Sequence, residues 1–334
     1  MYFQHIEQFR RAGEKALGFY GLDGASTLVL LHRSENATFL VTGRTENRPR
    51  AVMRVSRPGY RTLEEIQAEM RWLLKIAQEK VVTIAHPICC LDGSNVACVK
   101  AGGQEYYCVL CEYLEGEAPD PEDGERGFLW FQKTGEAAAK LHLQTVGWEE
   151  GRHLDRPVWD YEALLGPSGF FGDWRACGQL NREERAFLET VCETIRRRLL
   201  EYGREETRFG LIHSDLRASN LLTEGNAIKV LDFDDCGYGW HLFDLAASFS
   251  FIEDHPSVPG WIEAWLKGYT SVRSLTERDY GMIPTFLMAR RLQLLGWVTS
   301  HSDSDPVWVR DRGFAKRTFR MAERYMGQTI PIQI

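Results

Sequence analysis

A strand–loop–strand pattern around Asp215 constrains the fold of this chain more than any other feature of its sequence. Residues 209 to 212 predict a short strand, and the loop after it contains His213, Asp215 and Asn220 in the spacing H-x-D-x-x-x-x-N. Residues 227 to 231 predict a second hydrophobic strand, which a tight turn joins to the end of the loop. We therefore expect the carboxylate and the amide to project into one cleft from a short turn.

An aspartate ends the second strand, so the segment supplies two carboxylates and one amide. In phosphoryl transfer, one carboxylate accepts the proton of the attacking hydroxyl, while an amide and a second carboxylate hold Mg²⁺ against nucleotide phosphates. Asp215, Asn220 and Asp232 follow this order along the chain. The alternative is a surface hairpin with solvated carboxylates and with Gly225 and Asn226 at its tip. The flanking strands favour the catalytic interpretation, because strand context is what confirms such a motif.

The segment resembles the aminoglycoside phosphotransferase and choline kinase superfamily, which are small-molecule kinases. The pattern of that family appears here as His213-Ser-Asp-Leu-Arg-Ala-Ser-Asn220 and as Val230-Leu-Asp-Phe-Asp-Asp-Cys-Gly237. Homoserine kinase-like and stress-response kinase-like branches have similar loops. The resemblance implies a protein-kinase-like bilobal α+β fold, in which an N-terminal antiparallel sheet with a helix precedes a mostly helical C-terminal lobe. It also implies ATP and Mg²⁺ as cofactors, Asp215 as the catalytic base, and Asn220 and Asp232 as the metal ligands.

Length and composition set wider limits on the protein. A chain of 334 residues with 44% hydrophobic residues is long enough for two hydrophobic cores. The net charge of -7 argues against nucleic acid as a partner, since nucleic acid selects basic surfaces. The chain contains no run of eighteen apolar residues, so we predict no membrane span. The charged N-terminal segment does not resemble a signal peptide. Together with eight cysteines, which we expect to be reduced, these features predict a cytoplasmic enzyme.

The N-terminal part predicts a lobe that binds the nucleotide. Residues 26 to 43 predict two strands joined by a turn that includes Asn36, and residues 50 to 56 predict a third strand. Arg54 occupies the position at which kinases place the lysine that pairs with phosphates, and some members of the superfamily use arginine there. If the fold is kinase-like, the turn with Asn36 approaches the phosphates with backbone amides and short side chains. An exposed strand arginine is the alternative for Arg54.

A helix after the third strand offers an independent check on that assignment. Thr62 and Glu65 form a capping box, which predicts the start of the helix. Glu69 falls on the apolar stripe of this helix, where an unpaired charge would be costly. We expect Arg54 to be its partner, as in the strand-to-helix ion pair of kinases. A solvated Glu69 at the edge of the stripe is the alternative.

The boundary between the two lobes is predicted near residue 116. Residues 106 to 116 predict a strand that passes into a linker, and the resemblance implies that backbone groups near Glu112 and Leu114 meet the adenine edge. An acidic, proline-rich connection follows at residues 118 to 124. We therefore expect a nucleotide lobe over residues 1–115 and a catalytic and substrate lobe over residues 116–334.

The second lobe is expected to be mostly helical. Asp244 resembles the aspartate with which the family begins a helix, and we expect it to brace the catalytic loop by hydrogen bonds rather than to touch substrate. Helices are predicted over residues 129–145, 183–202, 241–252, 261–269 and 279–300.

The substrate is the least constrained part of the prediction. Asp234 and Asp235, together with Trp240, could bind a cationic amine through ion pairing and cation–π contact. Tryptophans spaced along helices are, however, usually core residues, and carboxylates are usually solvated. Arg290 and Arg291 could instead pair with a substrate carboxylate, or form salt bridges with Asp244 or its neighbours.

The sequence therefore predicts an ATP-dependent phosphotransferase that acts on a hydroxyl of a small molecule. Amino alcohols, homoserine-like amino acids and aminoglycosides are the candidate substrates. Two alternatives stay open: a protein Ser/Thr kinase of the stress-response type, and a nucleotide-binding, pseudokinase-like regulator. The presence of Asp215, Asn220 and Asp232 together argues against the regulator.

Overall fold

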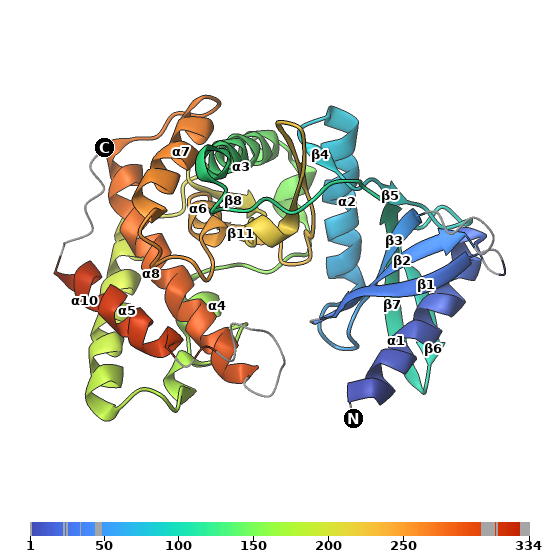
Figure 1. The fold of residues 1–334 in the computed structure, drawn as a ribbon, viewed down its shortest axis with the longest axis horizontal. Coiled ribbons are helices and arrows are strands. Elements are labelled where there is room, and N and C mark those ends of the chain that lie inside the picture. The colour runs from blue at the N-terminus through green and yellow to red at the C-terminus, as the bar shows by residue number, and fades with distance from the viewer. Residues whose placement is uncertain are drawn as a thin grey trace. The chain divides into compact units, whose positions relative to one another are not determined.

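The computed structural model of the chain describes residues 2–22, 24, 26–33, 35–43, 49–301, 311 and 313–327, without the side chains of residues 2–5, 49 and 50. The chain divides into two compact units, which are best followed in Figure 1 one at a time. The first unit comprises residues 1–116, 153–156 and 229–234, and the second comprises residues 117–152, 157–228 and 235–334. No helix among the described residues has the length and apolar character needed to cross a membrane.

An antiparallel sheet with two helices forms most of the first unit. The strand order is β1-β2-β3-β7-β5, and β6 pairs with β7. A short parallel pair, β4 with β10, is separate from this sheet. The elements are α1 (Tyr2–Leu17), β1 (Ser26–Arg33), β2 (Ala37–Gly43), β3 (Pro49–Val55), α2 (Leu63–Glu79), β4 (Thr83–Ile84), β5 (Pro87–Ile88), β6 (Ala97–Ala101), β7 (Gln104–Glu112) and the last two residues of β10 (Ala227–Val230). The three predicted N-terminal strands are thus confirmed, although part of the predicted turn, Ser34, lies outside the described residues.

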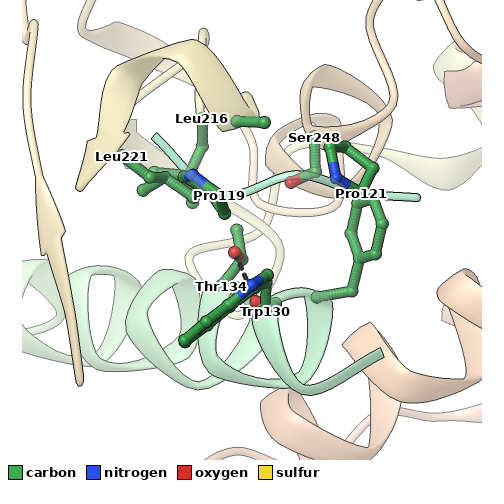
Figure 2. Close-up of a pocket in the computed structure, with 9 residues that line it drawn as sticks. Pro119, Pro121, Trp130, Thr134, Leu216, Leu221 and Ser248 are labelled. Carbon is green, nitrogen blue, oxygen red and sulfur yellow. Dashed lines mark hydrogen bonds between the residues drawn. The ribbon is translucent and has the colours of Figure 1, made fainter. Parts of the chain in front are cut away.

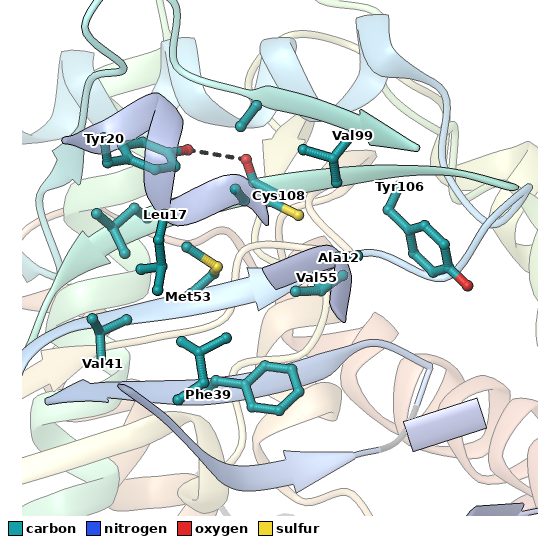
Figure 3. Close-up of a cluster of buried hydrophobic side chains, with 14 of the residues drawn as sticks. Ala12, Leu17, Tyr20, Phe39, Val41, Met53, Val55, Val99, Tyr106 and Cys108 are labelled. Carbon is teal, nitrogen blue, oxygen red and sulfur yellow. Dashed lines mark hydrogen bonds between the residues drawn. The ribbon is translucent and has the colours of Figure 1, made fainter. Parts of the chain in front are cut away.

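The core of the first unit lies between helix α1 and one face of the sheet (Figure 3). Side chains alternate along a strand, so every second residue of β2 and β3 faces this core. Phe39, Val41, Met53 and Val55 are all fully buried there, and Leu17 of α1 packs in the same cluster. Helix α1 was not among the predicted elements, although its apolar residues recur at helical spacing.

Helix α2 begins as its sequence predicts. Thr62 accepts a hydrogen bond from the backbone N–H of Glu65, and the Glu65 carboxylate accepts one from the N–H of Thr62, so the capping box is confirmed. Ile66 and Met70 of the expected apolar stripe are buried, and so is Glu69. The carboxylate of Glu69 is therefore on the inner face of the helix, where a cationic partner is required.

The second unit is mostly helical, as expected. Its helices are α3 (Gly124–Thr145), α4 (Tyr161–Leu165), α5 (Arg182–Tyr202), α6 (Phe243–Ser248), α7 (Val258–Thr270), α8 (Glu277–Ser300) and α10 (Phe314–Met326). Its strands are β8 (Phe209–Ile212), β9 (Leu221–Glu224) and β11 (Gly237–Trp240), and β8 pairs with β11 in antiparallel register. Four of the five predicted helices are confirmed, with α3 starting five residues earlier than predicted. The predicted strands at 209–212 and 227–231 are confirmed as β8 and β10, with Gly225 in a left-handed conformation at the turn.

The predicted helix over residues 241–252 is wrong in extent, since α6 covers only Phe243–Ser248. At the start, the backbone N–H of His241 donates to the carbonyl of Arg208, which continues the strand pairing instead of a helix. At the end, the N–H of Phe249 bonds to the carbonyl of Ala246, three residues back, and Phe251 has a positive φ of 71°. A tightened last turn followed by a left-handed residue ends a helix.

Helices α3 and α7 pack against each other at unusually close range because each has a glycine at the contact. A Cβ built on Gly135 of α3 would collide with the carbonyl oxygen of Trp265. A Cβ built on Gly268 of α7 would collide with the carbonyl oxygen of Gln132. Backbone atoms of the facing helix occupy both positions, so no rotamer change could make room for a side chain.

We expect Gly268→Ala to destabilise the protein, by about 1–3 kcal/mol, because the added methyl group forces the two helices apart. The change in the free energy of unfolding can be measured by urea denaturation. Gly281→Ala in α8 is the matched control, since nothing lies within 4 Å of a Cβ built there. That control should stabilise the helix by roughly 0.5–1 kcal/mol. Equal effects of the two substitutions would contradict the packing argument.

Candidate active site

The predicted catalytic loop lies in the second unit, directly after strand β8. Asp244 of α6 is fully buried and accepts hydrogen bonds from two backbone N–H groups of this loop. The distances are 3.1 Å from the nitrogen of His213 to Oδ2 and 2.6 Å from the nitrogen of Ser214 to Oδ1. Ser214 has a positive φ of 71°, a conformation that costs free energy for a residue other than glycine. The prediction that Asp244 braces the loop is confirmed.

A buried histidine completes the support of Asp244. His142 of α3 is fully buried, with its Nε2 2.8 Å from Asp244 Oδ2 and its Nδ1 3.0 Å from the hydroxyl of Tyr269. Burial, helped by the charge of Arg273, holds the pKa of His142 well below its usual range, so the imidazole is neutral. Burial raises the pKa of Asp244 to about 6, although the charge of His213 and the backbone N–H groups limit the rise.

Asp215 accepts hydrogen bonds at both of its carboxylate oxygens. Arg290 of α8 donates from Nη2 to Oδ1 at 2.5 Å. Arg217 donates from Nε to Oδ2 at 3.1 Å, and the amide of Asn220 donates to the same oxygen at 2.8 Å. Burial alone would raise the pKa of Asp215, but the charges of Arg217 and Arg290 outweigh it and lower that pKa to about 2. The side chain is therefore ionised at neutral pH and can accept a hydrogen bond from a hydroxyl.

The side-chain amide of Asn220 has only one chemically reasonable orientation. Its Nδ2 lies 2.9 Å from the backbone oxygen of Asp215 and 2.8 Å from Asp215 Oδ2, and both of these atoms are acceptors. The nitrogen must therefore face Asp215, which directs the amide oxygen of Asn220 elsewhere. Both side-chain hydrogen bonds of Asn220 come from its nitrogen, and neither involves this oxygen. An amide oxygen in this state fits the preference of Mg²⁺ for oxygen ligands.

Two leucines anchor the loop to the helices beneath it. Leu216 and Leu221 are buried on either side of Asn220, and they line a small apolar cavity of about 10 Å³. Figure 2 shows these leucines together with Trp130 and Thr134 of α3, and with prolines of the connection that precedes α3. The cavity has room for one water molecule at most, so we regard it as part of the packing of the loop.

The predicted ion pair is present in the first unit. Arg54 of β3 donates from Nη1 and Nη2 to the two carboxylate oxygens of Glu69, at 2.7 and 2.6 Å. The side chain of Arg54 is 12% exposed and that of Glu69 only 2%. Burial opposes the charge of Arg54, but Glu69 and Asp234 outweigh it and raise its pKa above the usual value. A bidentate pair of this kind fixes the guanidinium in one orientation.

Asp234 also belongs to this group of the first unit, which corrects its predicted role in binding substrate. Its Oδ1 lies 3.6 Å from Nη1 of Arg54, its Oδ2 accepts from the amide of Asn36 at 2.9 Å, and its backbone carbonyl accepts from Arg156. Burial opposes the ionisation of Asp234, but Arg54, Arg61 and Arg156 lower its pKa. A buried carboxylate surrounded by arginines is poorly suited to bind an amine.

Asn36 has a different role from the one predicted for its side chain. The amide donates to Asp234, and its oxygen accepts from the backbone N–H of Arg57 at 3.1 Å. Both ends of the side chain are thus engaged within the first unit, where the side chain positions Asp234. The approach of the backbone amides of this turn to phosphates stays a prediction. The backbone N–H of Glu112 donates to the carbonyl of His86, and contact of the other backbone groups near Glu112 with adenine stays a prediction. For Leu114, contact with adenine stays a prediction.

Asp232 lies just beyond strand β10, in the first unit. It is exposed and has a positive φ of 58°. The next residue, Phe233, is buried and packs edge-on against Trp72 of α2, with ring centroids 5.3 Å apart. The aromatic contact anchors the chain on one side of Asp232, while its left-handed backbone keeps the carboxylate at the surface. Its predicted role as a metal ligand stays a prediction.

The tryptophan predicted to contact substrate is a core residue. Trp240 is 2% exposed, and its indole N–H donates to the carbonyl of Gly203 at 2.7 Å. Its ring packs edge-on against Phe209. A substrate amine has no access to this buried ring, over which the guanidinium of Arg204 already lies, 5.5 Å from the ring centroid, so the predicted contact with substrate is wrong. Asp235, which is half-buried, stays a candidate for substrate binding.

Sequence reasoning missed the arginines that contact Asp215. Arg290 was predicted to pair with a substrate carboxylate, or with Asp244 or its neighbours, but it pairs with Asp215. Its neighbour Arg291 is fully buried and pairs with Glu253 at 2.6 Å. Two consecutive arginines inside an apolar helix were the sequence feature that could have predicted these ion pairs. Each guanidinium buried in such a helix requires a carboxylate as its partner.

Fold and site together place this chain among kinases that act on small molecules, and comparison with known proteins makes the placement definite. A model of the phosphotransferase enzyme family matches residues 27–280. The solved structure of a microcompartment-associated aminopropanol kinase is 35% identical, with a TM-score of 0.85 over 95% of this chain and 97% of that one. The chain belongs to the phosphotransferase enzyme family.

More distant relatives agree with this assignment. Amicoumacin kinase of Bacillus subtilis strain 168 is 22% identical over 262 residues, which cover 75% of this chain and 74% of that protein. An amicoumacin kinase solved in complex with AMP-PNP, Ca²⁺ and Ami has the same fold, with a TM-score of 0.76 at 18% identity over 98% of this chain and 96% of that one. The protein is thus a kinase that phosphorylates a hydroxyl group of a small molecule.

Proposed function

We propose that this protein transfers the γ-phosphoryl group of ATP to the hydroxyl group of a small amino alcohol. The observation that supports the acceptor class is the 35% identity to an aminopropanol kinase over nearly the whole of both chains. The family match and the relatives named above give no support to a protein Ser/Thr kinase.

An apolar row across the sheet of the first unit supports a site for the adenine base. Val29 of β1 pairs with Leu40 of β2, Leu40 pairs with Val52 of β3, and Val52 pairs with Cys111 of β7. These side chains lie on the face opposite the buried core, and none of them is fully buried. Arg54 follows Val52 by two residues and projects from the same face, where its guanidinium could meet phosphates. A flat apolar surface beside a fixed cation suits a nucleotide.

Asp215 is the proposed base for the acceptor hydroxyl. In a loose phosphoryl transfer the hydroxyl loses its proton late, so an ionised carboxylate that orients it is sufficient even when its pKa is low. By their positions in the family motif, Asn220 and Asp232 are the proposed ligands of Mg²⁺, which when bound offsets charge on the phosphates. Asp235, a half-buried carboxylate three residues after Asp232, is the proposed partner of the ammonium group.

A panel of acceptors tests the proposal. Phosphorylation of 1-aminopropan-2-ol, ethanolamine, homoserine and an aminoglycoside should be compared with ATP and Mg²⁺, by a coupled assay for ADP and by mass spectrometry of the product. We expect kcat/KM to be highest for the amino alcohols. Efficient transfer to homoserine or to the aminoglycoside alone would overturn the acceptor class while leaving the kinase assignment intact.

A further inference from the structure

Arg290 is held in place by more contacts than an ion pair needs. It is 2% exposed, in the middle of helix α8. Its Nε donates to the hydroxyl of Ser250 at 2.9 Å, its Nη1 donates to the side chain of Gln293 at 2.8 Å, and its Nη2 donates to Asp215. Each of the three nitrogens of the guanidinium thus has its own acceptor, so the group cannot turn without losing a hydrogen bond.

The donors around Asp215 are distributed unequally between its two oxygens. Oδ2 accepts from Arg217 and Asn220, which together occupy the two acceptor directions of a carboxylate oxygen. Oδ1 accepts only from Arg290, so one acceptor direction at Oδ1 stays open among the described residues. A hydroxyl that approaches this carboxylate therefore finds room at Oδ1, next to the guanidinium of Arg290.

We propose that Arg290 is a positioning residue for phosphoryl transfer, which fixes the Asp215 carboxylate so that Oδ1 receives the acceptor hydroxyl. The inference rests on the proposed role of Asp215 as the base. Arg290 acts by holding the Asp215 carboxylate in one orientation. It hydrogen-bonds to one carboxylate oxygen, while Asn220 and Arg217 hydrogen-bond to the other. A carboxylate free to rotate would offer the hydroxyl a range of orientations, and small errors of position at a reacting group are costly in rate.

The places of the residues that contact Arg290 support a functional role for its hydrogen bonds. Ser250 lies just beyond α6, whose residue Asp244 fixes the loop backbone, whereas Arg290 fixes the side chain of the same loop. The loop is thus braced twice, once at the main chain and once at the reactive group. Arg291 offers a contrast within the same helix. It is equally buried, but its guanidinium contacts Glu253, Asp254, the hydroxyl of Thr318 and the carbonyl of Phe314, and none of these residues belongs to the loop.

Two variants of Arg290 separate positioning from folding. Arg290→Lys keeps the charge, but a single ammonium cannot reach three separated acceptors at once, so Asp215 should lose its fixed orientation. We expect kcat to fall by about 10²-fold, with the KM for ATP nearly unchanged and a small change in Tm. Arg290→Ala should lose at least as much kcat, and millimolar guanidinium should restore part of it by occupying the vacated position.

The matched control is Arg291→Ala. It should lower Tm, because it leaves Glu253 buried without its partner, but kcat of the folded enzyme should stay within a few-fold of the wild type and should not respond to guanidinium. Wild-type kcat in Arg290→Lys, or equal rescue of both alanine variants, would overturn the proposal.

Crystal structures of the wild type and of Arg290→Lys test the same point without turnover. The Asp215 carboxylate should keep a single orientation in the first and lose it in the second. If the Asp215 carboxylate kept the same single orientation in the lysine variant, the positioning role of Arg290 would be contradicted, even if no acceptor were phosphorylated. Conversely, a wild type that is inactive on the whole acceptor panel would overturn the proposed function but not this structural result.

Discussion

Asp215→Asn should lower kcat by roughly 10²–10⁴-fold, the range expected when a positioned proton acceptor is removed. The substitution removes the negative charge and converts one oxygen into an NH₂ donor. Three donors, from Arg290, Arg217 and Asn220, already face this group, so the new NH₂ must oppose at least one of them. Both the acceptor site for the hydroxyl and its orientation are then lost, and steady-state turnover of the amino alcohol measures the result.

The affinity for nucleotide should change little in this variant, because Asp215 has no proposed contact with ATP. Calorimetric titration with AMP-PNP and Mg²⁺ checks this point, and Tm reports whether the loop still folds. Asp123→Asn, an exposed position at the start of α3, is the control and should behave as the wild type. Full turnover in folded Asp215→Asn would show that another group accepts the proton.

Asp232→Ala should abolish the contribution of Mg²⁺ to nucleotide binding. Since residues that merely support a metal ligand contribute 10–100-fold to metal affinity, removal of a ligand itself should cost at least about 100-fold. We expect the affinity for AMP-PNP without metal to be unchanged and the stimulation by Mg²⁺ to vanish. Titrations with and without Mg²⁺ measure the two quantities separately.

Asp235→Asn provides a contrast on a nearby carboxylate. If Asp235 binds the ammonium group, this variant should raise the KM for the amino alcohol and leave the Mg²⁺ dependence intact. The two aspartates would then have separable roles. An Asp232→Ala enzyme that still binds nucleotide more tightly with Mg²⁺ would remove Asp232 from the metal site.

Local features were predictable wherever neighbours in sequence determine them. The capping box of Thr62 and Glu65 and the hairpin turn at Gly225 each depend on residues a few positions apart. The pair of Arg54 with Glu69 spans only 15 residues, and it was predictable because a charge on an apolar helical stripe requires a partner. The bracing role of Asp244 followed from the resemblance, and the hydrogen bonds to the loop backbone explain it physically.

Errors arose where the deciding contact is distant in sequence. Asn36 and Asp234 are 198 residues apart, so neither local pattern showed that they bond to each other instead of to ligands. Trp240 was wrongly predicted to contact substrate. Its real partners, Gly203 and Phe209, belong to other elements and could not be identified from the sequence around Trp240. Helix α6 was overestimated because the strand-like hydrogen bond of His241 to Arg208 could not be seen in the local composition.

The sequence by itself determined the chemistry of this protein, because the spacing of Asp215, Asn220 and Asp232 between hydrophobic strands is itself the family pattern. Only the tertiary structure decided how the Asp215 carboxylate is held. Arg290 is 75 residues from Asp215, and a helix has to fold onto the catalytic loop before the two can meet. Ion pairs between distant segments depend on the exact packing of helices, and that packing is a property of the whole core rather than of any local stretch of residues.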